Sequence, residues 1–183
     1  MSMFHSTTER LIEYWRGQAV GGGLPPRASI SPADFSDLLP RVFILGRTFT
    51  GVYPLRLVGG FVADLHGRDL RRQNGLTLWA ERDRSRLQTA LEEARRRPEP
   101  IVAIADMLSD AGALGVEILF APLAGPDGAA DRFLGLYQPL GMTARLQGLP
   151  VTSLALRAIH NADGADEQAP RLRLATLDGR RIA

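Results

Sequence analysis

The sequence predicts an α+β domain built on an antiparallel sheet, and three observations support this class. Two short apolar segments, residues 42–45 and 53–58, flank a glycine-containing turn, which is typical of an antiparallel hairpin. A long amphipathic segment follows at residues 80–97. The third observation is a meander of apolar segments separated by turn residues, at residues 100–108, 115–124 and 132–140. The expected order is therefore two strands, a helical connection and three strands.

The first element expected along the chain is an amphipathic helix at residues 4–19. Leu11, Tyr14 and Trp15 are spaced i, i+3, i+4 and therefore share one face of this helix. An apolar face on a terminal helix needs a surface to cover it. That surface is either the rest of the same domain or a second copy of the chain. We predict a homodimer in which these three residues form the contact.

The second expected helix is short and precedes the hairpin. Ser31 suits its N-cap, and Pro32 suits its first turn because the N–H that proline lacks has no partner there. Pro40 marks the end of this helix. The first strand of the hairpin then begins within two residues.

The most regular predicted helix spans residues 80–97. Its apolar residues recur with the 3.6-residue period of one helix face: Leu87, Ala90, Leu91 and Ala94. Acidic and basic residues occupy the remaining positions, and we expect them, Glu92 and Glu93 included, to be solvated. Pro98 ends the helix because proline cannot continue it.

The C-terminal part of the chain carries weaker patterns. Residues 151–159 predict either a strand or a short helix, residues 160–169 a flexible loop, and residues 172–176 a late strand. We expect three regions along the whole chain: an N-terminal helix and linker at residues 1–30, a core domain at 31–145 and a C-terminal extension at 146–183.

Composition excludes several kinds of chemistry. The 183 residues include no cysteine, which excludes disulfides, thiolate catalysis and cysteine-ligated metal clusters. All 22 basic residues are arginine, but the net charge is only +2 and acids interrupt the arginines, so no nucleic-acid partner is expected. The N-terminus lacks a secretory pattern, and no apolar run reaches about 18 residues, so no membrane span is expected. We expect a cytoplasmic protein.

The order of elements and several motifs resemble the PAS domain family. The segment LRLVGGFVADLHGRDL, residues 55–70, resembles the PAS pattern of a strand that ends at a small residue, followed by a helix that runs to a glycine. The segments GVEILFAPL and FLGLYQPL resemble the closing hairpin. Residues 11–45 are similar to a narrower group, the small stand-alone PAS-like proteins of alpha-proteobacteria. The resemblance covers about residues 10–142.

The resemblance implies a five-stranded antiparallel sheet of order 2-1-5-4-3 over residues 41–142. Short helices would cover one face of the sheet as a lid. Gly59-Gly60 would permit the sharp exit from the second strand, because glycine tolerates a positive φ angle. Gly67 would end the first lid helix, and Asn74-Gly75 would end the next segment.

In such a fold we expect a mostly apolar cavity between the sheet and residues 61–79. A filled core would use the same side chains, so the sequence leaves both arrangements open. The predicted lining consists of aromatic and branched residues from strand ends and lid turns: Phe43, Val58, Phe61, Leu65, Leu70, Trp79 and Tyr137.

Three polar residues are further candidates for ligand binding. His66 lies in the lid, where it either ends a helix or faces the cavity. Arg56 and Glu117 interrupt apolar strands, and each is exposed, paired or inside the cavity, because burial of a lone charge is costly. One histidine does not make a metal site, so no metal is expected.

Neither heme nor flavin is expected as a cofactor. Heme-binding PAS proteins usually supply a histidine from the long helix before the third strand, and residues 80–97 contain none. The absence of cysteine excludes photochemistry through a cysteinyl–flavin adduct, and no motif supports plain flavin binding.

The function that the resemblance implies is that of a sensory or regulatory module. Such a module acts through protein–protein contacts, with a second copy or a signalling partner, and through a small apolar ligand. The alternative is a small-molecule-binding enzyme on the same fold, which needs a cluster of polar groups with shifted pKa values in the cavity. The strands carry few such residues, so no catalytic residue is expected.

Overall fold

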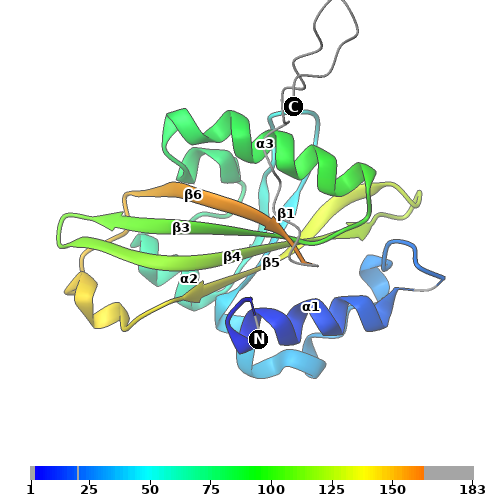
Figure 1. Cartoon of the computed structure of the whole chain (residues 1–183), viewed down its shortest axis with the longest axis horizontal. Coiled ribbons are helices and arrows are strands. Elements are labelled where there is room, and N and C mark those ends of the chain that lie inside the picture. Colours follow the sequence, from blue (N-terminus) through cyan, green and yellow to red (C-terminus); the bar gives the residue numbers. More distant parts are fainter. Residues whose placement is uncertain (1–2, 20, 163–183) are drawn as a thin grey trace, which may run out of the picture.

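Six antiparallel strands form one sheet in the order β2-β1-β5-β4-β3-β6 (Figure 1). The computed structural model describes residues 3–19 and 21–162. The strands are β1 (Val42–Gly46), β2 (Leu55–Val58), β3 (Ile101–Ser109), β4 (Gly112–Ala124), β5 (Ala130–Pro139) and β6 (Ser153–Asn161). The α-helices are α1 (Ser6–Gln18), α2 (Gly60–His66) and α3 (Glu81–Arg96). The 3-10 helices are η1 (Arg27–Ser29), η2 (Pro32–Arg41), η3 (Gly75–Leu78) and η4 (Thr143–Leu146).

The α+β class and the order of the first five strands are confirmed, but the expected number of strands was wrong. β6 pairs with β3 and extends the sheet from five strands to six. Residues 151–159, for which strand and helix were both open, contribute to this strand. His160 belongs to β6 and not to the predicted flexible loop. The predicted strand at residues 172–176 lies outside the described residues.

Helices cover both faces of the sheet, whereas short helices were expected over one face only. Figure 1 shows α3 on one side of the sheet and α1 on the other. We call the face under α2, η3 and α3 the inner face, and the face under α1 and η2 the outer face. All five residues of β1 are buried because Phe43 and Leu45 join the inner core while Val42 and Ile44 join the outer core.

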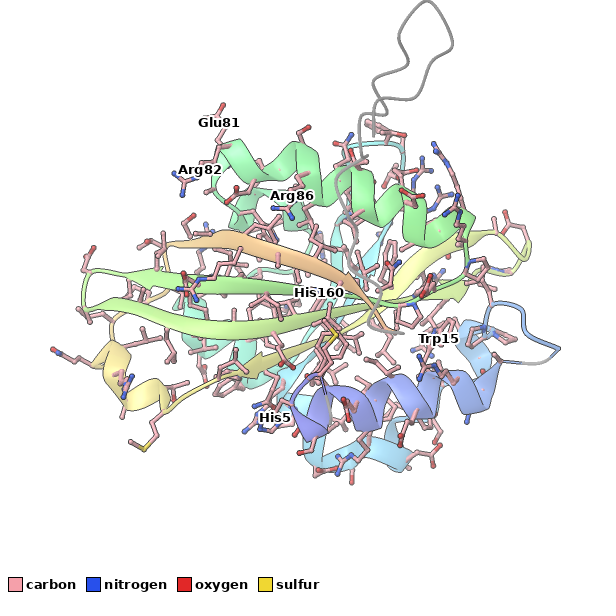
Figure 2. All side chains as sticks on the ribbon, in the orientation of Figure 1. His5, Trp15, Glu81, Arg82, Arg86 and His160 are labelled. Carbon is pink, nitrogen blue, oxygen red and sulfur yellow. The ribbon has the colours of Figure 1, made fainter. Side chains whose placement is uncertain are left out.

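The N-terminal helix packs on the sheet of its own chain. Leu11 and Trp15 are 1% and 5% exposed, and Figure 2 shows Trp15 between α1 and the sheet. The indole Nε1 of Trp15 donates a hydrogen bond to the carbonyl oxygen of Pro122 in β4 at 2.7 Å. The hydroxyl of Tyr14 accepts from the backbone N–H of Ser31 at 2.9 Å. These bonds attach α1 both to the sheet and to the segment that follows it.

One acidic residue of α3 is not solvated as expected. Glu92 is 8% exposed and accepts hydrogen bonds from Arg47, Arg95 and Tyr53. Burial raises the pKa of Glu92, but the hydrogen bonds from Arg47 and Tyr53 outweigh it and hold that pKa below its ordinary value. Glu92 therefore joins α3 to the loop between β1 and β2. By contrast, Glu81 and Arg82 project from the start of α3 away from the sheet (Figure 2).

Candidate functional site

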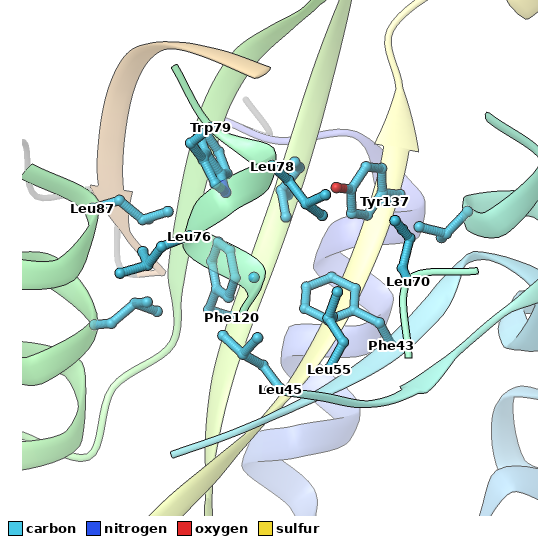
Figure 3. A pocket seen from close by; sticks show the side chains of 14 residues that line it. Phe43, Leu45, Leu55, Leu70, Leu76, Leu78, Trp79, Leu87, Phe120 and Tyr137 are labelled. Carbon is cyan, nitrogen blue, oxygen red and sulfur yellow. The ribbon is translucent and has the colours of Figure 1, made fainter. Parts of the chain in front are cut away.

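The inner core contains a small cavity between the sheet and the lid, which we define as residues 59–79 (Figure 3). Its volume is about 20 Å³, and a single water needs about 10–15 Å³. Its walls are formed by Phe43, Leu45, Leu55, Val62, Leu70, Gly75, Leu76, Leu78, Trp79, Leu87, Leu91, Ile118, Phe120 and Tyr137. Trp79 and Tyr137 alone bring polar side-chain atoms to this wall. The cavity is therefore apolar, with one hydroxyl and one indole N–H.

The lid begins at Gly59, where the end of η2 closely approaches the chain. A Cβ at Gly59 would lie 2.3 Å from the carbonyl oxygen of Pro40 and 2.4 Å from that of Leu39. The φ angle of Gly59 is −66°, so the expected positive φ is wrong, and close approach of η2 explains this glycine. Gly60 has open space around its Cα and begins α2.

The rest of the lid follows the sequence signals in part. Gly67 has a φ of 60° and ends α2, as predicted. Asn74 does not end the next segment as expected. Its side chain accepts a hydrogen bond from the N–H of Leu76 and caps the start of η3. The lid thus consists of two short helices over the inner face of the sheet. Gly67 ends the first, α2, and Asn74 caps the start of the second, η3.

A buried polar pair stands at one end of the cavity. His66, at the end of α2, is 4% exposed, and Tyr137, on β5, is 3% exposed. The Tyr137 hydroxyl lies 3.4 Å from His66 Nε2. His66 Nδ1 lies 3.2 Å from the carbonyl oxygen of Val151, which precedes β6. Lid, sheet and the segment before β6 therefore meet through one line of hydrogen bonds.

Burial keeps both members of this pair neutral. Burial lowers the pKa of His66 to about 4, a shift that the hydrogen bond to Val151 opposes and the positive charge of Arg68 reinforces. Burial raises the pKa of Tyr137 above its ordinary value. At neutral pH the pair is therefore an uncharged imidazole beside an uncharged phenol, and it can exchange hydrogen bonds but carries no charge.

The structure brings together four of the seven residues predicted to line the cavity. Phe43, Leu70, Trp79 and Tyr137 form parts of its wall (Figure 3). Val58 and Leu65 pack against the same inner core without lining the cavity. Alternation on the strands and the turns of the lid explain this division, because each element presents only some of its apolar residues inward.

Phe61 and Arg56 do not reach the cavity, which corrects two expected positions. Phe61 lies under the guanidinium of Arg41, whose Cζ is 5.4 Å from the ring centroid. Phe61 is half-buried on the outside of α2, because this helix turns Val62 and His66 inward. Arg56 is exposed on the edge strand β2, and its side chain extends over Gly46.

Glu117 is buried, but on the outer face of the sheet and not in the cavity. Its two carboxylate oxygens accept the backbone N–H of His5 at 3.0 and 3.1 Å. One of them also accepts the hydroxyl of Thr8 at 2.6 Å. This carboxylate therefore binds the N-terminus of α1, where the helix dipole favours a negative charge. Its role is to hold the helix on the sheet, and the prediction that it binds a ligand in the cavity is wrong.

Replacement of Glu117 by glutamine is expected to lower the free energy of unfolding by about 1–2 kcal/mol, because hydrogen bonds to a charged acceptor are the stronger kind. Chemical denaturation measures this, and hydrogen exchange of α1 should quicken. Glu93→Gln, at an exposed position of α3, is the matched control and should change stability by less than about 0.5 kcal/mol. Equal effects of the two substitutions would contradict the anchoring role of Glu117.

The residues predicted to form a dimer contact lie mostly inside the protomer. Leu11 and Trp15 belong to the outer core, and Tyr14 packs edge-on against Phe35 with 5.1 Å between ring centroids. The two buried side chains have almost no surface left for a second copy. Of the two surfaces that the sequence left open for this helix, the structure uses the chain's own sheet. The dimer itself stays a prediction.

Most of the residues that line the cavity were not predicted from the sequence. The missing residues include Ile118 and Phe120 on β4 and Leu87 and Leu91 on α3. A signal for the β4 pair was present, because alternation from an outward Glu117 places residues 118 and 120 on the opposite face. The α3 pair had been recognised as an apolar stripe, but the stripe alone does not say what it covers.

A family model described as PAS domain matches residues 3–138. The chain belongs to the PAS domain family. The match starts before α1 and ends in β5, so it includes the lid, the cavity wall and the helix on the outer face. The narrower resemblance to stand-alone proteins of alpha-proteobacteria stays a prediction for this PAS domain.

Solved structures similar to this PAS domain include light-oxygen-voltage proteins. The LOV protein of Rhodobacter sphaeroides is 13% identical with a TM-score of 0.46, over 62% of this chain and 70% of that one. An RNA-binding light-oxygen-voltage receptor is 16% identical with a TM-score of 0.48, over 71% of this chain and 38% of that one. A light-oxygen-voltage domain studied with a flavin analogue is 13% identical with a TM-score of 0.46, over 63% and 87%. Similarity at this level does not say what this PAS domain binds.

The comparison with curated proteins found no match. Within residues 3–19 and 21–162, no group of three or more histidine, aspartate or glutamate side chains is placed to hold a metal ion. Among the same described residues, no helix is both long and apolar enough to cross a membrane.

Proposed function

We propose that this PAS domain is a sensory or regulatory module of the cytoplasm in which a small apolar ligand, held under the lid, controls contacts with other proteins. The observation that carries the proposal is the apolar cavity between the inner face and the lid. Ligand sites in proteins are typically concave, mostly apolar and provided with a few placed polar groups. The cavity with its single phenol and single indole has this composition on a small scale.

The size of the cavity limits the ligand. Pockets that hold drug-sized molecules measure about 300–1,000 Å³, and the volume here is about 20 Å³. A ligand larger than water therefore enters only when the lid moves away from the sheet. The short helices of the lid suit such movement, because each is attached through a few backbone hydrogen bonds, such as that from Gly75 to the carbonyl oxygen of Tyr53.

We propose neither flavin nor heme as the ligand. Both are far larger than the cavity, and both need polar partners that its wall lacks. The nearest histidine is His66, whose Nδ1 faces the carbonyl oxygen of Val151 and whose Nε2 faces Tyr137, so neither nitrogen is directed at the open space. The same apolar wall argues against an enzyme, because a catalytic site needs several polar groups around the substrate.

Contacts with other proteins are the proposed output, and a homodimer is the first case to test. Because Leu11 and Trp15 are buried in the protomer, we propose that any second copy binds elsewhere on the surface. Sedimentation at tens of micromolar, a concentration range that reveals micromolar affinities, measures the oligomeric state with and without an apolar probe.

Addition of toluene, a small apolar probe, is expected to raise the melting temperature of the protein, because a ligand that binds only the folded state stabilises it. Val62→Leu adds one methylene at the cavity wall and should take up the free space. In that variant the rise should be much smaller. Differential scanning calorimetry measures both.

Val58→Leu is the matched control, since Val58 packs on the same core outside the cavity wall. This variant should keep the response of the wild type. If toluene leaves the melting temperature of the wild type unchanged, the proposed ligand site is wrong. If the two leucine variants respond alike, the probe binds somewhere other than the cavity.

A further inference from the structure

The hydrogen bonds around His66 have only one consistent direction. The carbonyl oxygen of Val151 can only accept, so His66 Nδ1 carries the proton in the bond that joins them. A neutral imidazole then has no proton on Nε2, which becomes an acceptor. The lowered pKa of His66 keeps the ring in this neutral form at physiological pH.

The direction of these bonds decides what Tyr137 presents to the cavity. Its hydroxyl has one proton, and the nearby acceptor for that proton is His66 Nε2 at 3.4 Å. The lone pairs of Tyr137 Oη are what remains for the cavity side. Figure 3 shows this oxygen directed toward Leu78, among the apolar side chains of the wall. No hydrogen bond to these lone pairs occurs within the described part of the chain.

We propose that the ligand of this cavity is a small aromatic molecule with one hydrogen-bond donor, of the phenol class, whose O–H bonds to Tyr137 Oη. The inference rests on the proposed function and names the chemistry of the same site. A donor would satisfy a buried acceptor that lacks a partner, and such bonds count for more away from water. A ligand that can only accept hydrogen bonds would face the lone pairs of Tyr137 Oη. It would lose its hydrogen bonds to water and gain none from the protein in return.

The ring of the proposed ligand follows from the aromatic side chains of the wall. Phe43 lies edge-on to Phe120 with 5.6 Å between centroids, and edge-on to Tyr137 with 5.7 Å. Aromatic rings favour such tilted contacts, and a ligand ring that enters between them would continue the same arrangement. The lid must move outward to admit it, since the present volume accommodates about one water.

The test compares three probes of similar size that differ in hydrogen bonding: phenol, toluene and pyridine. Phenol can donate, toluene can neither donate nor accept, and pyridine can only accept. Isothermal calorimetry with the wild type at neutral pH should show phenol binding roughly 3- to 10-fold more tightly than toluene, the gain typical of one hydrogen bond. Pyridine should bind no more tightly than toluene.

Two variants separate the hydrogen bond from simple burial. Tyr137→Phe keeps the ring and should remove the preference for phenol over toluene while toluene still binds. His66→Phe keeps the edge-on contact of 6.0 Å between centroids but removes the acceptor, which releases the Tyr137 proton toward the cavity. Pyridine should then gain relative to toluene. The ranking of the probes in the wild type needs neither variant to fold.

Each result has a distinct meaning. Equal binding of phenol and toluene by the wild type would overturn this inference and leave the proposed apolar site standing. Tighter binding of pyridine than of phenol would also overturn it, because the bond direction would then be reversed. Failure of all three probes to bind would overturn both the inference and the proposed function.

Discussion

Replacement of Gly59 by alanine is expected to lower the free energy of unfolding by about 3 kcal/mol, at the upper end of the cost of overpacking a well-filled site. The added Cβ would lie 2.3 Å from the carbonyl oxygen of Pro40 and 2.4 Å from that of Leu39. These are backbone atoms at the end of η2, which cannot turn aside as a flexible side chain can. Either η2 or the start of the lid must shift. Chemical denaturation measures the loss.

The neighbouring glycine is the control. Gly60 is exposed, has no atom within contact distance of an added Cβ, and is the first residue of α2. Gly60→Ala should leave stability unchanged or raise it by about 0.5–1 kcal/mol, because alanine favours the helix and restricts the unfolded chain. Equal losses of unfolding free energy in the two variants would contradict the steric explanation. They would mean that both positions need the backbone flexibility of glycine.

Stability is expected to fall by about 3 kcal/mol as the pH decreases from 6.5 to about 4. The pKa of His66 is 6.5 in the unfolded chain and about 4 in the folded protein. Between pH 6.5 and about 4, His66 is therefore protonated in the unfolded state but mostly neutral in the folded state. The difference of about 2.5 pKa units corresponds to about 3 kcal/mol of unfolding free energy. The stability that depends on a neutral His66 is fully present above pH 6.5 and is lost as the pH falls to about 4. Urea denaturation across this range measures it.

His66→Phe removes the titrating group and retains a ring of similar size. The slope of stability against pH between 4 and 6.5 should become shallower in this variant, although its stability at neutral pH changes because the bond to Val151 is lost. An unchanged slope would assign the pH dependence to other groups, and would mean that the imidazole accepts its proton without leaving the folded core.

The strands and their order were largely predictable, because short apolar segments separated by turn residues leave few alternatives. β6 was the exception. Its residues are mixed in polarity, and within the described residues it pairs on one side only, with β3, so its alternation is weak. Its pairing with β3 depends on hydrogen bonds between segments more than forty residues apart, for which residue types carry little signal.

The cavity and the buried charges were predictable only in part. Four aromatic and branched residues were placed correctly because the PAS resemblance indicates which strand ends and lid turns converge. Glu117 and Glu92 were misjudged for a common reason. A carboxylate in an apolar strand or on a helix surface has many acceptable partners, and the partner is selected by contacts distant in sequence: the N-terminus of α1 for one, Arg47 and Tyr53 for the other.

The sequence by itself determined the family, the α+β class, the order of the first five strands and the ends of the longer helices. These follow from local periodicity, capping residues and turns, which act within a few residues of each other. The tertiary structure alone decided that α1 covers its own sheet and that Gly59 is required by the close approach of η2. It also decided that His66 donates a hydrogen bond to Val151 and accepts one from Tyr137. Each of these depends on two or three elements meeting in space, and the bond direction between them follows from that meeting.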